Sequence, residues 1–319
     1  MNARWGPCPV CCEEGAAGHL VRVPGRVFVH CPHCDVRWAP LPESTEALPF
    51  DLTHYTAKQE VKGWSFEAGV REYLRLFEEL PHAPGERFLE IGPGNGEVLE
   101  AARRLGLRCT GFDVDPTALD GLTHLRDVRL VHGQLTPERF PEGPFDIIFS
   151  NNVIEHIPKP IDFLARLRAL LAPHGRLWVS CPNVASYEAQ ILGSYWPQYA
   201  PQDHVRLYSP TALRAVLERA GLAVERVWTQ EGSFDFPLTM LAGARNFLVR
   251  HRAPGAELTA REYGGGAAVP SDPARQLAMR LVYQVVPLCG IPFAWATPRF
   301  GVAQHLRALA RAAGCAPST

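Results

Sequence analysis

The apolar residues in the middle of the chain fall into two alternating kinds of segment. One kind is a short continuous apolar run, typical of a buried strand, and the other spaces apolar residues three or four apart, as an amphipathic helix does. Strands over residues 87–91, 107–112, 128–133, 145–150, 176–181 and 222–227 are expected, with helices over 65–80, 97–105, 161–171 and from Ser209 to Gly221. This alternation predicts an α/β fold with a Rossmann-like, doubly wound parallel sheet.

The C-terminal third departs from this alternation. Apolar segments at 238–248 and 277–295 predict packed helices, and residues 252–272, rich in Gly, Ala and Pro, predict disorder. A last strand at 304–311 would return antiparallel to the others and make residues 233–300 an insertion. The same residues could equally form a helix.

Composition places the chain among ordinary globular proteins. It has 319 residues, 46% hydrophobic and 20% charged, with a net charge of -1. Without a global positive field, nothing favours nucleic acid as a partner.

The absence of a signal-like apolar start predicts a cytoplasmic protein. The longest apolar run, residues 277–295, is broken by one arginine, a glutamine, a glycine and two prolines. We therefore expect no transmembrane helix and do not favour membrane-surface contact. The oligomeric state stays open.

Two Cys-x-x-Cys pairs flank a strand, turn and strand pattern at residues 20–23, 24–25 and 26–30. Such a hairpin would bring the pairs together, so that four thiolates surround one Zn²⁺ tetrahedrally and the metal replaces a hydrophobic core. A closed four-thiolate site has a structural role. Cys12, His30 and His33 remain alternative ligands. The preferred zinc ligands are Cys8, Cys11, Cys31 and Cys34.

A glycine-rich turn, Gly92-Pro93-Gly94-Asn95-Gly96, joins the strand at 87–91 to the helix at 97–105. Strand, glycine turn and helix form a nucleotide-site arrangement. A dinucleotide fingerprint would need its third glycine where Glu97 stands, and that carboxylate would repel a pyrophosphate. Asp113, at the end of the second strand, is placed to accept hydrogen bonds from ribose hydroxyls, while Asp115 would begin the following helix.

Together, several stretches resemble the successive motifs of class I S-adenosylmethionine-dependent methyltransferases, over roughly residues 60–230. The stretches are residues 88–96, 111–113, 145–157 and 171–177. Bacterial small-molecule and glycan methyltransferases with an N-terminal zinc ribbon are the most similar group. The resemblance implies a seven-stranded sheet that binds S-adenosylmethionine. It divides the chain into a zinc ribbon and linker (1–45), a methyltransferase domain (46–230) and a helical C-terminal insertion or extension (231–319).

The resemblance also assigns cofactor contacts. It implies that Glu90 and the glycine turn hold the methionine part, that the turn at Asp113 holds the ribose, and that two asparagines hold the amino-acid end or face the methyl group. Where the family commonly has an acid facing the adenine, this chain has Gln134, whose carbonyl could accept from the adenine amino group. The implied cofactor residues are Glu90, Gly92, Pro93, Gly94, Gly96, Asp113, Val114, Gln134, Asn151 and Asn152.

Candidate catalytic residues follow the fourth and fifth strands. Methyl transfer is an in-line displacement, so the protein mainly positions the nucleophile and removes the proton of a hydroxyl. His156 could be that base or could only order its loop, and Glu155 and His204 are further candidates. Relatives in the ubiquinone pathway bind a divalent metal through a Glu-x-x-Glu-His run. The first acid here is Asn152, so we do not expect a metal-assisted mechanism.

The long segment 182–207 is typical of a binding loop or lid. Its aromatic residues could stack on a sugar or aromatic acceptor, or could form a core in which Asp203 and His204 staple the loop. These aromatic residues are Tyr187, Tyr195, Trp196 and Tyr199.

The leading hypothesis is therefore O-methylation of a sugar, a glycan precursor or another small metabolite. N- or C-methylation, or a protein or RNA substrate, would use the same cofactor. A non-catalytic module that retains the cofactor is the alternative of a different class.

Overall fold

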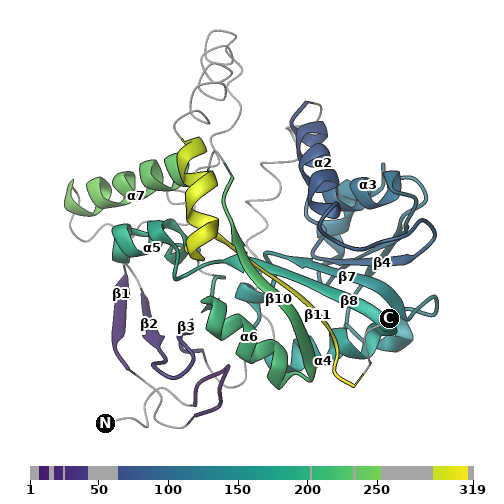
Figure 1. The fold of residues 1–319 in the computed structure, drawn as a ribbon, viewed down its shortest axis with the longest axis horizontal. Coiled ribbons are helices and arrows are strands. Elements are labelled where there is room, and N and C mark those ends of the chain that lie inside the picture. Colours follow the sequence, from purple (N-terminus) through teal and green to yellow (C-terminus); the bar gives the residue numbers. More distant parts are fainter. Residues whose placement is uncertain are drawn as a thin grey trace.

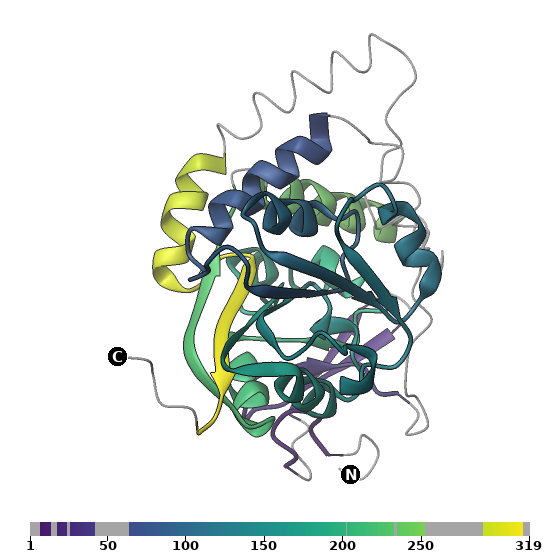
Figure 2. The ribbon, with the colours of Figure 1, turned by 90° about the vertical axis from the view of Figure 1, so that its right-hand side faces the viewer.

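The computed structural model describes residues 7–13, 18–23, 26–41, 64–201, 203–232, 235–252 and 290–314. These residues form a large central sheet flanked by helices, with a small second sheet at one side (Figures 1 and 2). Three sequence predictions lie wholly or mostly outside the described residues. They concern the Pro24-Gly25 turn, the disordered stretch at 252–272 and the apolar segment at 277–295.

The central sheet has seven strands in the order β10-β11-β8-β7-β4-β5-β6. β11 pairs antiparallel with both of its neighbours, and the other adjacent strands pair in parallel. The predicted doubly wound, seven-stranded sheet is therefore confirmed. Its strands are β4 (Arg87–Ile91), β5 (Arg108–Asp113), β6 (Arg129–His132), β7 (Phe145–Asn151), β8 (Leu171–Pro182), β10 (Leu222–Gln230) and β11 (His305–Ala312).

Helices cover both faces of this sheet because successive strand residues point to opposite sides. Phe88 belongs to the core under α2 and α3, while its neighbour Leu89 belongs to the core under α4 and α6. Ser209 caps α6 by accepting from the main-chain nitrogen of Ala212 at 3.2 Å, as its position before the helix predicts. The helices are α2 (Trp64–Phe77), α3 (Glu97–Arg104), α4 (Pro160–Leu170) and α6 (Pro210–Arg219).

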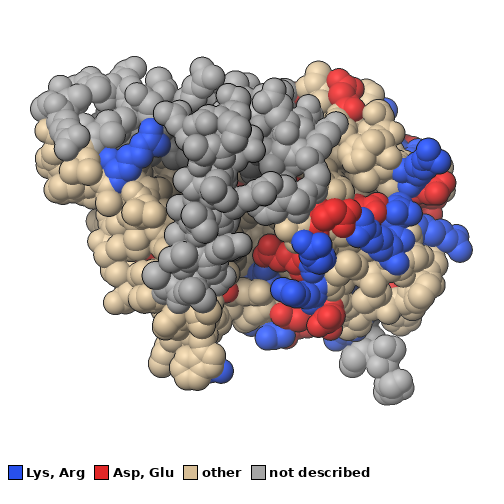
Figure 3. Space-filling model, turned by 90° about the horizontal axis from the view of Figure 1, so that it is seen from above, with Lys and Arg blue, Asp and Glu red and all other residues tan. Residues whose placement is uncertain are grey.

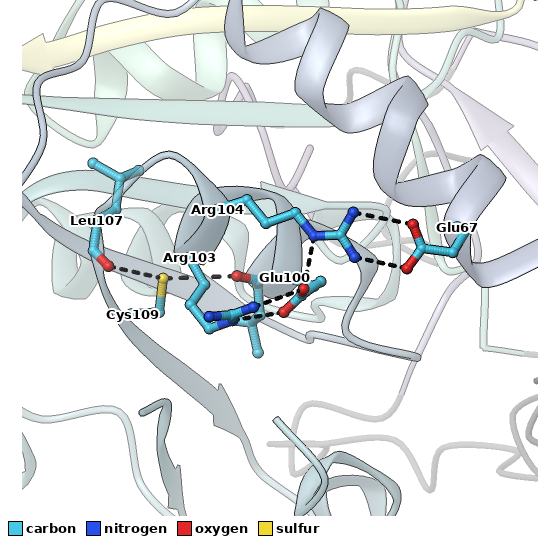
Figure 4. Close-up of polar contacts among 7 residues, drawn as sticks. Glu67, Glu100, Arg103, Arg104, Leu107 and Cys109 are labelled. Carbon is cyan, nitrogen blue, oxygen red and sulfur yellow. Dashed lines mark hydrogen bonds and ion pairs between the residues drawn. The ribbon is translucent and has the colours of Figure 1, made fainter. Parts of the chain in front are cut away.

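An arginine joins α2 to α3, the helix that follows the glycine turn. Arg104 on α3 donates to Glu67 of α2 at 2.6 Å and to Glu100 at 2.7 Å, and Arg103 also donates to Glu100 (Figure 4). Two arginines around Glu100 lower the pKa of its carboxyl to about 2. The network fixes α2 alongside the helix that carries the glycine turn.

The N-terminal hairpin, β1 (Leu20–Val23) and β2 (Arg26–His30), belongs to a four-stranded sheet that contains a piece of the larger domain. β3 (Arg37–Trp38) pairs with β2 on one side and with β9 (Arg206–Leu207) on the other. Phe28 of the hairpin shares a buried core with Trp196, Tyr199 and Leu207. The hairpin is thus docked against the loop that precedes β9.

Residues 304–311 form a strand, not a helix, since β11 fills the slot between β8 and β10. Between β10 and β11 the described chain contains α7 (Asp235–Arg252), a helical stretch at 290–296 and the short helix η6 (Thr297–Phe300). α7 includes the predicted helix at 238–248, packs near α5 (Tyr187–Leu192) and buries the polar Thr239 and Asn246. Among the described residues, no helix has the length and apolar character that a membrane crossing needs.

Candidate functional site

The glycine turn between β4 and α3 has a backbone that only glycine adopts easily. Gly92, Gly94 and Gly96 have φ values of 68°, 53° and 83°, all in the left-handed region. A Cβ on Gly92 would lie 2.8 Å from a methyl of Val153, and one on Gly96 would lie 2.8 Å from a methyl of Leu125. Both the conformation and the close approach of neighbouring side chains therefore require these glycines.

Glu90 lies two residues before this turn, near the carboxyl end of β4. Its side chain is 2% exposed, and Oε2 has no hydrogen-bond partner. Burial, together with the nearby Glu97 carboxylate, raises the pKa of Glu90 well above its usual range. A buried carboxyl with an unpartnered oxygen, close to a second acid, suits a cationic ligand group far better than a phosphate.

Asp113 ends β5, next in the sheet to β4. Its carboxylate accepts from the main-chain nitrogen of Asp115 at 3.0 Å, and burial raises its pKa. Asp115 caps the following short helix by accepting from the nitrogen of Thr117 at 2.8 Å, as predicted. Val114 is 52% exposed and Gln134 is also exposed, so both side chains lie at the surface beyond these strand ends.

Asn151 and Asn152, at the end of β7, have different surroundings. Asn151 donates to the hydroxyl of Tyr73 at 3.1 Å and accepts from the hydroxyl of Ser180, so its side chain is already engaged within the protein. Asn152 is exposed with a φ of 52°, and its main-chain nitrogen donates to the oxygen of Ser180. Tyr73, from α2, is a contact that the sequence did not indicate.

The three candidate catalytic residues converge. Glu155 and His156 lie on the short helix η3 (Ile154–His156) after β7, and His204 comes from the loop after β8. One ligand atom from each lies within 4.8 Å of the others. The three residues are 1%, 8% and 7% exposed, respectively. We call these three residues the Glu-His-His cluster.

Neighbours on the loop orient both imidazoles. Nδ1 of His156 lies 3.1 Å from the main-chain oxygen of Asp203 and 3.3 Å from its carboxylate, while Nδ1 of His204 lies 3.0 Å from the oxygen of Gln198. The two rings meet edge to face with centroids 4.9 Å apart. Main-chain oxygens only accept, so Nδ1 carries the proton in each ring and Nε2 carries the lone pair when the ring is neutral.

Burial and charge shift the titration of this cluster. Burial raises the pKa of Glu155 to about 7. Burial would lower the pKa of His156, but its contact with Asp203 and the nearby Glu155 outweigh that effect and raise it. Burial, with the neighbouring His156, lowers the pKa of His204 to about 3, which makes His204 a neutral imidazole.

The loop between β8 and β9 packs on the hairpin. Trp196 and Tyr199 are 1% and 2% exposed, so they belong to the core, whereas Tyr187 is 44% exposed. Arg26 of β2 donates to the oxygens of Pro201 and His204. For Trp196 and Tyr199 the structure supports the packing alternative over stacking on an acceptor.

The four predicted zinc ligands also converge. Sγ of Cys8 lies 3.6 Å from Sγ of Cys34, and Sγ of Cys11 lies 3.6 Å from Sγ of Cys31. A tetrahedral Zn²⁺ with bonds of about 2.3 Å separates its sulfur ligands by about 3.8 Å, so this donor set fits zinc. The alternatives are not in the cluster. Cys12 and His33 are exposed, and the His30 ring contacts the Asp35 carboxylate at 2.8 Å.

A hollow of about 1000 Å³ lies at the opposite edge of the sheet, where β4 and β5 begin, and its lining includes Arg87, Arg108 and Asp146. No predicted cofactor residue lines it. Acidic and basic side chains are interspersed on the described face shown in Figure 3, so that face offers no continuous basic surface for nucleic acid.

Comparisons with known proteins identify the family to which the chain is similar. A family described as "Methyltransferase domain" matches residues 63–227, just over half of the chain. The ubiquinone biosynthesis O-methyltransferase of Aeromonas salmonicida (strain A449) is 31% identical over 152 residues, 44% of this chain and 64% of that enzyme. The enzyme of the same name from Pseudomonas aeruginosa (strain UCBPP-PA14) is 30% identical over 166 residues, 48% of this chain and 72% of that enzyme. The chain thus spans about two thirds of the length of these relatives.

A solved structure supports the fold. It is a complex between the Haloferax volcanii Trm112 methyltransferase activator and a methyltransferase, and the similarity covers 84% of this chain and 100% of the matched chain with a TM-score of 0.51 and 16% identity. At this level of identity the similarity shows a shared fold. The glycine turn, the seven-stranded sheet and the family match together show that the chain belongs to the methyltransferase domain family and is a class I S-adenosylmethionine-dependent methyltransferase.

Proposed function

We propose that this protein methylates a hydroxyl oxygen of a small organic acceptor. The observation that carries the proposal is the buried Glu-His-His cluster, because a hydroxyl must lose its proton as it is methylated. The cluster begins three residues after Asn152, at the end of β7, where parallel sheets of this type bind their ligands. The curated relatives, which are named as O-methyltransferases, support the choice of oxygen.

The cofactor would lie along the carboxyl ends of β4, β5 and β7. We propose that Glu90 and the turn from Gly92 through Pro93 and Gly94 to Gly96 hold the methionine part. The unpartnered Glu90 oxygen is suited to its amino group. Asp113 and Val114 would hold the ribose, and Gln134 the adenine. Asn151 and Asn152 would border the methyl group, with Asn151 fixed by Tyr73 and Ser180.

Bound S-adenosylmethionine supplies a methyl group on a sulfonium, which is already a good leaving group. The protein's task is to hold the acceptor oxygen in line and to remove its proton. His156, Glu155 and His204 would handle that proton, and Asp203 would orient His156. Because the cluster is almost completely buried, its charges act on the acceptor with little screening by water.

We also propose that Cys8, Cys11, Cys31 and Cys34 hold a structural zinc ion. The fit of their sulfur separations to tetrahedral zinc supports the proposal. Through β3 and Arg26, the hairpin that the zinc would fix is joined to the loop carrying His204. The hairpin would then lie behind the acceptor side of the proposed site.

The proposal is tested by incubating the purified full chain with S-adenosylmethionine and separate panels of phenols, sugars, amines, protein and RNA, while following formation of S-adenosylhomocysteine. Turnover with a hydroxyl acceptor, a methoxy product, and loss of turnover in His156→Ala with S-adenosylhomocysteine binding retained are expected. Turnover only with amines, protein or RNA would contradict the proposal. Cofactor binding without turnover on any panel would instead favour a non-catalytic module.

A further inference from the structure

The Glu-His-His cluster has the composition and shape of a metal site. Its donors are one carboxylate and two imidazoles from two segments far apart in the sequence. Apart from the four cysteines, it is the one group of three or more potential ligands that converges in the described part of the chain. Unlike a surface group of acids, all three residues are buried.

The ligand run of the ubiquinone-pathway relatives does not fit this chain. Its first acid is replaced by Asn152, which is exposed and has a left-handed backbone. The relatives' set of two carboxylates and one imidazole suits a hard cation such as Mg²⁺, and this chain lacks one of the two carboxylates. The structure supplies a different third donor, His204, from the loop after β8.

The outer contacts of both imidazoles match those of metal ligands. A metal-binding histidine usually donates its other N–H to a carboxylate or a main-chain oxygen. Nδ1 of His156 meets the carboxylate and main-chain oxygen of Asp203, and Nδ1 of His204 meets the oxygen of Gln198. The lone pair of each neutral ring is then on Nε2.

The surroundings of the Glu155 carboxylate also favour a bound cation. Glu155 is 1% exposed, and its Oε2 has no hydrogen-bond partner. A buried carboxylate oxygen without a partner is unfavourable, and either a bound cation or a proton relieves this cost. The main-chain oxygen of Glu155 accepts from the nitrogen of Val205 at 2.8 Å, so the helix η3 and the loop that carries His204 are held in register.

We infer that Glu155, His156 and His204 bind one divalent transition-metal ion, with Zn²⁺ as the preferred ion and Mg²⁺ excluded by the two imidazole donors. Two imidazoles and one carboxylate leave a coordination position open. The ion would supply a Lewis acid that favours the ionised form of an acceptor hydroxyl. That catalytic role rests on the proposed function, but the binding itself does not.

The inference is tested by elemental analysis of the full chain after growth with zinc and extensive dialysis. Wild-type protein should hold about two zinc ions per chain, one at the four cysteines and one at the cluster, and Glu155→Gln and His204→Gln should each hold about one. Glu138→Gln and His174→Gln are matched controls, because both residues are exposed and lie outside the cluster. These controls should hold about two.

A second measurement guards against misfolded variants. Wild-type protein that already holds one zinc ion should bind a second Zn²⁺, but not Mg²⁺, in a calorimetric titration. About one zinc ion in wild type with no second binding event, or selective binding of Mg²⁺, would overturn the inference.

The two proposals fail separately. Full hydroxyl methylation by protein with only the cysteine-bound zinc would refute the metal at the cluster but keep the proposed function, with His156 acting as the base without a metal. A second zinc ion bound without turnover on any hydroxyl would support the metal site and refute the proposed function.

Discussion

Arg26 donates a hydrogen bond of 2.9 Å to the main-chain oxygen of His204, which links the N-terminal hairpin to a candidate catalytic residue. The same guanidinium donates to the oxygen of Pro201 at 2.6 Å and lies over the Phe28 ring. Burial lowers the pKa of Arg26 to about 10, which still leaves it charged at neutral pH. Arg26 is therefore a positioning residue for the loop, although it belongs to a different sheet.

Arg26→Ala should lower kcat more than it changes the affinity for S-adenosylhomocysteine. The variant should also be less stable, because it loses two charge-assisted hydrogen bonds that contribute about 1.5–3 kcal/mol each. Steady-state kinetics, calorimetry and thermal unfolding provide the three readouts. Arg22→Ala is the matched control, since Arg22 is exposed on the same hairpin. Arg26→Lys should recover part of kcat, and an unchanged kcat in Arg26→Ala would refute the positioning role.

Cys31→Ser should remove one zinc ion and release the hairpin from its folded state. Under the proposal, a zinc ion takes the place of an extensive core of the module's own, so limited proteolysis of the variant should cut its N-terminal region faster than in wild type. Turnover should fall as well, because the hairpin supports the loop of His204. Cys12→Ser is the control, as Cys12 is exposed and outside the cysteine cluster. Equal protection of both variants from protease would contradict a zinc-dependent hairpin.

Asp113→Ala should weaken binding of S-adenosylhomocysteine about 10- to 100-fold, because hydrogen bonds from ribose hydroxyls to a charged acceptor contribute about 1.5–3 kcal/mol. Isothermal titration calorimetry measures this loss directly, with NAD as a ligand expected not to bind. Asp120→Ala, an exposed site on the neighbouring short helix, should bind as wild type does. Wild-type affinity in Asp113→Ala would show that the ribose is held elsewhere.

Glu231 should make the folded protein less stable as the pH rises. Burial, with the adjacent Glu188, raises the pKa of Glu231 to about 9 from an ordinary 4.5. Between these values the folded protein retains a proton that the unfolded chain has released, so stability falls with rising pH, by at most about 1.4 kcal/mol per pH unit. The effect should be absent below about pH 4.5, where both states are protonated.

Glu231→Gln tests this dependence, since glutamine keeps the contacts with Gln304 and Thr297 without the ionisation. Chemical denaturation between pH 5 and 9 should show a flatter stability profile for this variant than for wild type. Glu78→Gln, at an exposed position, should follow the wild-type profile. Parallel profiles for wild type and Glu231→Gln would mean that Glu231 is ionised in the folded protein.

Local patterns were sufficient for the parts of the protein whose structure depends on near neighbours. The glycine turn follows from the left-handed backbone that Gly92, Gly94 and Gly96 must adopt, and Ser209 caps its helix from within the same turn. The spacing of the four cysteines was enough to predict a hairpin that brings them together. The periodicity of apolar residues predicted the strands and helices of the sheet, because the spacing of apolar residues within each segment reflects which of its own side chains are buried.

Tertiary structure decided what depends on distant segments. Residues 304–311, rich in Ala, Leu and Arg, have no clear local preference, and they become β11 because Leu306, Ala308 and Ala310 are buried in the slot between β8 and β10. The pairing of β3 with β9, and the convergence of His204 with Glu155 and His156, likewise depend on how the loop after β8 folds back. The spacing of apolar residues within a segment cannot predict how this loop folds back, since the contacts of the loop join residues that lie about 50 to 170 positions apart. The sequence by itself determined the class of fold and the glycine turn, and only the tertiary structure assembled the Glu-His-His cluster.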